Sequence, residues 1–470
     1  MPPKDRASAL LEGPILASLM KLAVPIVLAN VLQSGYQVID AFWVGRLGGA
    51  AVAAVSVTFP VVFLSIALGF GLAIAGSTLI AQYFGARDMA MVDKVAAQTL
   101  LMVAGVSLVL GVLGYIVAPA LLKMMGVGVD VYDGALGFMR VSFISLVFNF
   151  SFFTYQSIMR GVGETTTPIY IVAGTVALNF VIDPPLIFGW GPIPAMGVMG
   201  AAIATLITQI LAAATGIFIL LRGKYGVKLT WAALKPDPAF IKRVFFLGLP
   251  ASVEMSARAL SAFVLTFLIA SFGTLTIAAY GVGSTVLQVV VIPAMGLSMA
   301  ISALVGQNIG AGNIERASRI GRLGALLGFW TLTGIGVLVF IIAPWVVAFF
   351  VPEDKAVIAE GAVFLRIMAL AWGCIGAMMA LTAVLRASGN MVMAMVMTMV
   401  SQWAIQFPLA YVLSKHTSLG ADGLWWAFPI TNVLSVLIAM GIYAKGDWKK
   451  TRLLDEDEKL AEKVAEEIPS

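Results

Sequence analysis

The chain has 470 residues, of which 60% are hydrophobic and only 11% are charged, against about 25% charged residues in a typical soluble domain. Together with a mean hydropathy of +0.99, this composition excludes a soluble enzyme, a nucleic-acid-binding protein and a disordered chain. It predicts an all-α protein that crosses the membrane many times. A single cysteine and a single histidine exclude a disulfide framework and argue against a histidine-ligated metal site.

Twelve apolar stretches are long enough to cross a bilayer as helices, which takes about 20 residues each. Charged residues and clusters of Gly, Pro and Asn separate them. In chain order the predicted spans are 15–44, 51–81, 94–120, 133–160, 167–189, 196–221, 242–270, 277–307, 317–346, 357–386, 391–413 and 420–444.

Most lysines and arginines outside these spans collect in the loops on one side. The other side holds only Arg46, Lys123, Lys355 and Lys415. Because basic loops stay in the cytoplasm, we expect a multi-pass protein of the plasma or inner membrane with both termini cytoplasmic. The charged tail at 445–470 is expected to form a short amphipathic or frayed helix in the cytoplasm.

The second half of the chain repeats the first. Pro25 corresponds to Pro250 and Gly48 to Gly273, in both cases 225 residues later. Each half has an even number of spans, so the halves run parallel about an axis along the membrane normal. We therefore expect two pseudo-symmetric six-helix bundles that enclose a central cleft. The predicted parts are an N-terminal lobe at 1–221, a cytoplasmic linker at 222–241, a C-terminal lobe at 242–444 and the tail at 445–470.

Only three acids fall inside predicted spans, namely Asp40, Asp183 and Glu254. A carboxylate within the bilayer is costly, so each is a candidate functional residue. In the repeat, leucines stand where the second half would need counterparts of Asp40 and Asp183. A purely structural need would have kept polar residues in both halves, so this asymmetry favours a functional role.

Helical spacing groups further side chains with the two acids of the first half. Gln33, Tyr36, Asp40 and Trp43 share one face of the first span, and Asn179 lies one turn before Asp183 on the fifth. If these faces meet, the pocket holds two acids beside amide and hydroxyl groups. Such a pair can take up a proton, or its hard oxygen ligands can chelate a small cation such as Na⁺.

Glu254 differs from the other two acids because Arg258 follows it one turn later. The pair could simply neutralise itself on one helix, or both side chains could line a substrate cleft with Gln33 and Trp43. Pro25 lies within the first span, where it removes a helical hydrogen bond and allows a bend. We expect it to act as a hinge, with a static kink as the alternative.

Four motifs of the first half stand out together. They are Gln33-Ser-Gly-Tyr36-Gln-Val-Ile-Asp40-Ala-Phe-Trp43, Gln82-Tyr-Phe-Gly85-Ala86, Arg160-Gly-Val-Gly163-Glu-Thr-Thr-Thr-Pro168 and Asn179-Phe-Val-Ile-Asp183-Pro184. In these motifs the chain resembles the multidrug and toxic compound extrusion (MATE) transporters, and within them the DinF-like branch. The resemblance covers roughly residues 12–445.

This resemblance implies a twelve-helix secondary antiporter that expels cationic or amphipathic drug-like compounds in exchange for H⁺ or Na⁺. Its expected surroundings are membrane lipid, with no nucleic-acid partner, and its expected state is a monomer without a cofactor. At matching positions, Asp40, Asn179 and Asp183 resemble the family's proton or cation site, with Tyr36 as a neighbour. Thr205 resembles the hydroxyl that completes it, so Na⁺ would be held by Asp40, Asn179, Asp183 and Thr205.

Other functions remain as alternatives to an antiporter. A lipid-linked oligosaccharide flippase shares the two-lobed architecture, but it would use several basic residues in its cleft, and only Arg258 lies mid-span. A passive channel or receptor is a further alternative. The chain has neither an HExxH motif nor a Ser/His arrangement, so we expect no enzymatic activity.

Overall fold

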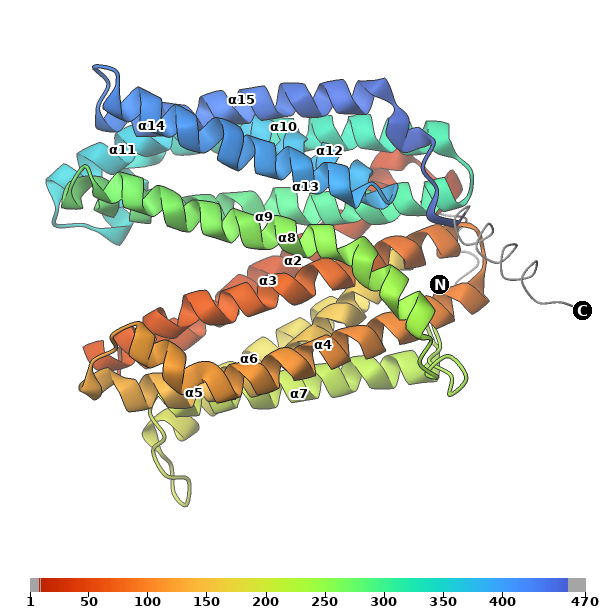
Figure 1. Ribbon diagram of the computed structural model, residues 1–470, viewed down its shortest axis with the longest axis horizontal. Helices are drawn as coiled ribbons and strands as arrows, with labels where there is room; N and C mark the ends of the chain where they lie inside the picture. Colours follow the sequence, from red (N-terminus) through yellow and green to blue (C-terminus); the bar gives the residue numbers. More distant parts are fainter. Residues whose placement is uncertain (1–7, 9, 455–470) are drawn as a thin grey trace, which may run out of the picture. The chain divides into compact units, whose positions relative to one another are not determined.

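The computed structural model describes residues 8 and 10–454 of the chain. Long helices make up almost all of this part, and its only β-structure is an isolated bridge between Trp190 and Ile193. Eleven of the described helices are long and apolar enough to cross a membrane, or twelve when one bent pair counts as a single span (Figure 1). The predicted all-α fold with many membrane spans is therefore confirmed.

The helices follow the predicted spans closely. Those of the first half are α2 (Ile15–Gly45), α3 (Gly49–Gly85), α4 (Met89–Met124), α5 (Val129–Gly161), α6 (Thr166–Phe188) and α7 (Val198–Arg222). Those of the second half are α8 (Pro238–Ala270), α9 (Thr274–Gly310), α10 (Ile314–Phe350), α11 (Lys355–Ala369), α12 (Trp372–Ala387), α13 (Met391–Met399), η1 (Val400–Gln406), α14 (Phe407–Lys415), α15 (Ala421–Lys445) and η2 (Asp447–Lys449).

The sequence repeat is also a structural repeat. Helices α3 and α9 both have 37 residues, and each begins one position after a glycine in the same unusual backbone conformation. The φ angles are 104° at Gly48 and 106° at Gly273, a region that glycine enters without a steric penalty. The same turn thus ends the first helix and starts the second in both halves.

The two halves differ at the fourth and fifth spans. Helix α5 is continuous, whereas its counterpart in the second half consists of α11 and α12, which meet at a bend of 48°. The fifth span of the first half is the α-helix α6, whereas its counterpart contains the π-helical stretch η1 between α13 and α14. A π-helical turn accommodates an inserted residue within an α-helix, and such turns occur often at functional sites.

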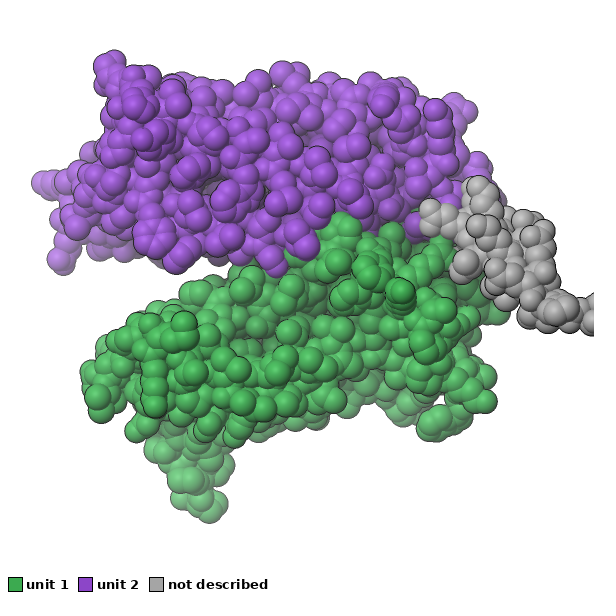
Figure 2. Space-filling view, in the orientation of Figure 1, with its two compact units in different colours: residues 1–9, 28–252 green, residues 10–27, 253–470 purple. Residues whose placement is uncertain are grey.

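Contacts divide the chain into two compact units, which Figure 2 shows in different colours. Unit 1 contains residues 28–252 and unit 2 contains residues 10–27 and 253–454 of the described chain. Two helices therefore belong to both units: α2 changes unit between Val27 and Leu28, and α8 between Ser252 and Val253. These points again lie 225 residues apart, each two residues after a repeated proline.

The predicted lobes were defined by the sequence repeat, whereas the two units are defined by contacts within the structure. The units therefore do not test the lobe boundaries, which stay a prediction. The predicted linker at 222–241 belongs entirely to unit 1. Most of the predicted tail helix, from residue 455 onward, lies outside the described residues.

Candidate functional site

The first and sixth spans meet through two pairs of polar side chains in unit 1. Thr205 on α7 donates a hydrogen bond to Oδ2 of Asp40 on α2, at 3.3 Å. One turn away on each helix, the hydroxyl groups of Tyr36 and Thr208 form a second hydrogen bond. The predicted Asp40 face therefore packs against the hydroxyl-bearing face of α7.

The fifth span supplies the second acid. On α6, Nδ2 of Asn179 donates a hydrogen bond to Oδ1 of Asp183 at 3.1 Å, and both residues have no solvent exposure. The carboxyl groups of Asp183 and Asp40 lie close enough to interact with each other. The structure thus brings together all five residues predicted for this site, namely Tyr36, Asp40, Asn179, Asp183 and Thr205.

Three oxygen atoms of this cluster are buried without a hydrogen-bond donor in the described part of the chain. They are Oδ1 of Asp40, Oδ2 of Asp183 and Oδ1 of Asn179. Buried polar atoms ordinarily have partners, and two neighbouring carboxylates repel each other in a poorly solvated environment. A proton shared by the acids would relieve that repulsion, and a small cation bound by these oxygens would do the same.

The oxygen atoms suit a monovalent hard cation better than a transition metal. Two carboxylates, an amide and a hydroxyl are available, and hard cations prefer such oxygen ligands. Among the described residues, no three His, Cys, Asp or Glu side chains come together in a way that could hold a metal ion. These oxygen atoms could accept a proton or contact Na⁺, and the exchange of either ion stays a prediction.

Thr208 is a member of the site that the motifs did not single out. Its hydroxyl bonds to Tyr36 and also donates to backbone carbonyls of its own helix, at 2.9 Å for Thr205. It follows Thr205 by three positions, which places it on the same helix face. That spacing was the available signal in the sequence.

The substrate-cleft candidates Trp43 and Gln33, both on α2, lie in different environments. Trp43 packs against Phe180 and Phe188 of α6, with ring centroids 5.7 and 6.2 Å away. It therefore helps to hold α2 against the helix that carries Asp183. Gln33 is exposed, and its predicted substrate contact stays a prediction.

Glu254 and Arg258 lie in unit 2, in a separate cluster. Oε1 of Glu254 accepts hydrogen bonds from Arg386 on α12 at 2.5 Å, from Thr398 on α13 at 2.9 Å and from Arg258 at 3.3 Å. Glu254 is fully buried, so this cluster joins three helices. The expected pairing of Glu254 with Arg258 is present, but a stronger contact with Arg386 accompanies it, and a substrate role stays a prediction.

Pro25 lies inside the continuous helix α2. The boundary between the units follows two residues later. The role of Pro25 as a hinge stays a prediction, and its place beside the boundary between the units is compatible with that role.

Comparisons with known proteins place the chain among transporters. The MatE family model matches residues 25–184 and 250–412. The "Probable multidrug resistance protein YoeA" of Bacillus subtilis is 31% identical over 93% of this chain and 95% of its own length. The "FAD transporter" of Shewanella oneidensis is 27% identical over 92% of this chain and 94% of its own.

Solved structures agree on the fold. A structure described as "Crystal structure of MATE in the straight conformation" has a TM-score of 0.86 and 24% identity, and covers 95% of this chain and 99% of its own. The match of the family model on both halves covers more than half of the chain, while membership of the DinF-like branch stays a prediction. The chain belongs to the MatE family of multidrug efflux transporters.

Proposed function

We propose that this protein is a secondary active multidrug exporter, which expels cationic or amphipathic compounds in exchange for H⁺ or Na⁺ by alternating access. One observation carries the proposal: Asp40 and Asp183 face each other in unit 1, supported by Thr205 and Asn179. Acids within membrane spans are costly and mark ion pathways. Here the cost would be offset whenever an ion occupies the site.

Both the relatives and the chain itself support this substrate class. The Staphylococcus aureus relative named "Multidrug export protein MepA" is 23% identical over 91% of this chain. A cationic compound and the exchanged ion would be attracted by the same carboxylates. Competition between them for Asp40 and Asp183 would couple the uptake of one to the release of the other.

Movement of α2 is the proposed link between the ion and the substrate. Pro25 leaves one helical hydrogen bond unmade, and the helix passes from unit 2 to unit 1 shortly after it. Asp40 lies further along the same helix. We propose that ion binding at Asp40 favours one shape of α2 and release favours the other, so that each shape opens access to one side of the membrane.

The test is drug efflux from proteoliposomes under a pure pH gradient and, separately, a pure Na⁺ gradient. Wild-type protein should respond to at least one gradient, and Asp183→Asn and Asp40→Asn should each abolish the response. Glu315→Gln is a matched control because Glu315 is an exposed acid that pairs with Arg319 on its own helix. It should transport like wild type.

The outcome that contradicts the proposal is efflux at the wild-type rate by the Asp183→Asn protein. Substrate flux that ignores both gradients would also overturn it and would favour a passive channel. Equal amounts of folded protein in the membranes must be verified for every variant. The response to one gradient alone identifies the exchanged ion.

A further inference from the structure

The loop between α7 and α8 is hydrogen-bonded to α4, which belongs to the same unit. Gln98 on α4 donates from Nε2 to the carbonyl oxygens of Ala233 and Lys235, both at 2.7 Å. Its Oε1 accepts from the amide of Asp237 at 3.0 Å. One buried side chain thus fixes three points of the loop.

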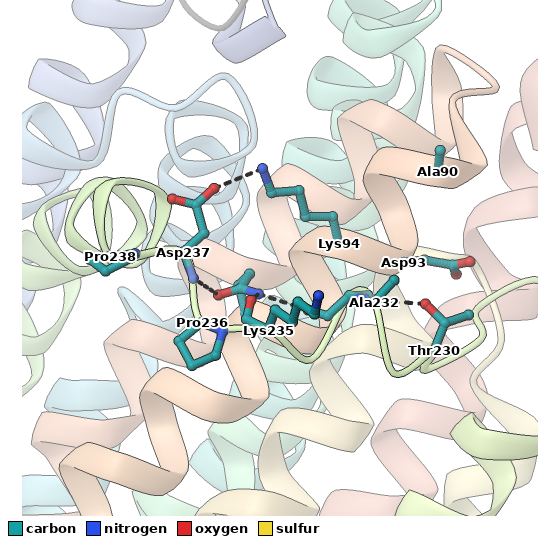
Figure 3. A pocket seen from close by; sticks show the side chains of 11 residues that line it. Ala90, Asp93, Lys94, Thr230, Ala232, Lys235, Pro236, Asp237 and Pro238 are labelled. Carbon is teal, nitrogen blue, oxygen red and sulfur yellow. Dashed lines mark hydrogen bonds and ion pairs between the residues drawn. The ribbon is translucent and has the colours of Figure 1, made fainter.

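Two further contacts fix the two ends of this loop. The amide of Lys228 donates to Asp93 at 2.7 Å, and Lys94 pairs with Asp237 at 2.9 Å. A hollow of about 740 Å³ lies between the loop and α4, and Figure 3 shows Lys94, Lys235 and Asp237 among the residues that line it. The backbone of residues 228–237 therefore has a defined position at the end of the spans.

This fixed loop presents one large apolar side chain to its surroundings. Trp231 is 88% exposed, although the loop around it is well bonded. A tryptophan has an apolar body and one polar N–H group, so it favours the boundary between lipid and water. Because the loop is held by hydrogen bonds, the exposure of Trp231 indicates a surface that lipid or another partner covers.

The same loop is basic. Lys224, Lys228 and Lys235 are all exposed, and Arg222 at the end of α7 is exposed as well. The side-chain bonds that hold the loop come from Gln98, Asp93 and Lys94, and they reach the backbone or Asp237. All three loop lysines are exposed and can face an anionic partner, while Lys224 also lies over the ring of Tyr225 and the charge of Lys228 also acts on Asp93.

We propose that residues 222–237 form a docking surface for the headgroups of anionic phospholipids, in the leaflet at this end of the spans. Helices α7 and α8 are both long and apolar enough to cross a membrane, and the loop joins the end of one to the start of the other, so a lipid surface is the nearest partner. Trp231 enters the headgroup region, and the basic side chains attract the phosphates. The docked loop anchors unit 1 to one leaflet independently of transport.

The test uses the full chain with Cys374→Ser, so that a cysteine placed at position 231 is the only one. A polarity-sensitive fluorophore on Trp231→Cys is followed in vesicles of phosphatidylcholine alone and of phosphatidylcholine with phosphatidylglycerol. Brominated lipids report immersion by quenching. We expect stronger quenching with phosphatidylglycerol, and its reversal by high salt.

The loop between α6 and α7 supplies the matched control. Its Trp190 is 74% exposed, and residues 189–197 include no lysine or arginine. A label at Trp190→Cys should respond equally to the two vesicle types. When the label is at position 231, each of the substitutions Lys224→Gln, Lys228→Gln and Lys235→Gln should weaken the partition of the labelled loop into the anionic surface about five-fold. This is the effect of losing one basic residue near such a surface.

Equal quenching at position 231 in both vesicle types overturns the proposal, as does a label that stays in water in both. The second result would leave the surface to a soluble partner. Drug efflux by the same proteins is measured in parallel, and lipid docking is expected whether or not efflux is coupled to an ion. The Trp231→Cys protein should unfold at the wild-type temperature, since the side chain it replaces is exposed.

Discussion

Gly71 on α3 lies directly against the backbone nitrogen of Ser252 on α8, and a methyl group on Gly71 would approach that nitrogen to 2.1 Å. The repeat contains the same contact a second time. A methyl group on Gly296 of α9 would approach the nitrogen of Val27 on α2 to 3.0 Å. The two pairs are related by a shift of 225 residues, so in each unit a glycine packs against the middle of a helix that belongs to both units.

The first prediction is that Gly71→Ala destabilises the protein by about 1–3 kcal/mol, the usual cost of overpacking. The backbone of α8 would have to move, because no side-chain rotation relieves a clash with a main-chain nitrogen. Thermal unfolding of the purified protein measures the effect. Gly105→Ala on α4 is the control, since a methyl group there meets nothing within 4 Å.

Gly105→Ala should be neutral or slightly stabilising, as alanine favours a helix. Unfolding of Gly71→Ala at the same temperature as Gly105→Ala would show that the contact is looser than the structure indicates. Gly296→Ala tests the second copy and should also destabilise. Its contact with the backbone nitrogen is longer than that of Gly71, at 3.0 Å against 2.1 Å, so a smaller effect is expected.

Much of the fold could be predicted because the membrane restricts the choice. Long apolar stretches must become helices, and Gly48 and Gly273 mark the turns between the first two of each half. The bend between α11 and α12 and the π-helical stretch η1 could not be predicted. They depend on packing within unit 2, which leaves no periodic pattern in the sequence.

In the candidate site, contacts within one helix could be predicted from the sequence, whereas contacts between distant residues could not. Asn179 and Asp183 share a helix, so their contact follows from spacing alone. The contact of Thr205 with Asp40 joins residues far apart in the chain, and only the family resemblance suggested it. Glu254 was correctly paired with Arg258, but its 2.5 Å contact with Arg386 joins α8 to α12, residues far apart in the chain, and had no local signal.

The second prediction concerns the hydroxyl that supports Asp40. Thr205→Val keeps the shape of the side chain but removes the hydrogen bond to Oδ2. A hydrogen bond to a charged group contributes about 1.5–3 kcal/mol, so the ion concentration that gives half-maximal efflux should shift by roughly ten-fold or more. Efflux at graded ion concentrations measures the shift.

Thr205→Ser retains the hydroxyl and should restore the wild-type ion dependence. Thr215→Val is the control on the same helix, because Thr215 bonds only to the carbonyl of Leu211 and is exposed. A Thr205→Val protein with unchanged ion dependence would remove Thr205 from the site. A reduced maximal rate alone would not count as support, since packing defects also produce it.

The third prediction is that Arg386→Met destabilises unit 2 strongly. It leaves Glu254 buried without its shortest ion pair, and breaking a buried pair from one side costs about 3–5 kcal/mol. A large drop in the unfolding temperature is expected. The exposed pair of Arg319 with Glu315 is the control, and Arg319→Met should change stability by less than about 1 kcal/mol.

A double variant separates the pair from the packing around it. Glu254→Leu combined with Arg386→Met removes both charges, so it should be more stable than Arg386→Met alone. Equal stability of the double and single variants would mean that the charges do not interact. Drug efflux by any stable variant then tests the substrate role of Glu254 and Arg258.

The fourth prediction is a pH dependence of the loop that Gln98 holds. The hydrogen bond from Lys94 lowers the pKa of Asp237 below its ordinary value. A depressed carboxyl pKa means that the ion pair contributes fully above about pH 4, the ordinary value, and is lost as pH falls through the folded pKa. The pair is partly exposed, so its effect is local rather than global.

Amide hydrogen exchange across residues 228–237, corrected for the intrinsic effect of pH, measures this loosening. Protection should be constant near neutral pH and should fall below about pH 4. Asp237→Asn should show the loosened state already at neutral pH, while an Asn side chain can still accept from the amide of Phe240 at the start of α8. If Asp237→Asn is as protected as wild type at neutral pH, the ion pair with Lys94 contributes nothing to the position of the loop, and Gln98 and Asp93 hold it without that pair.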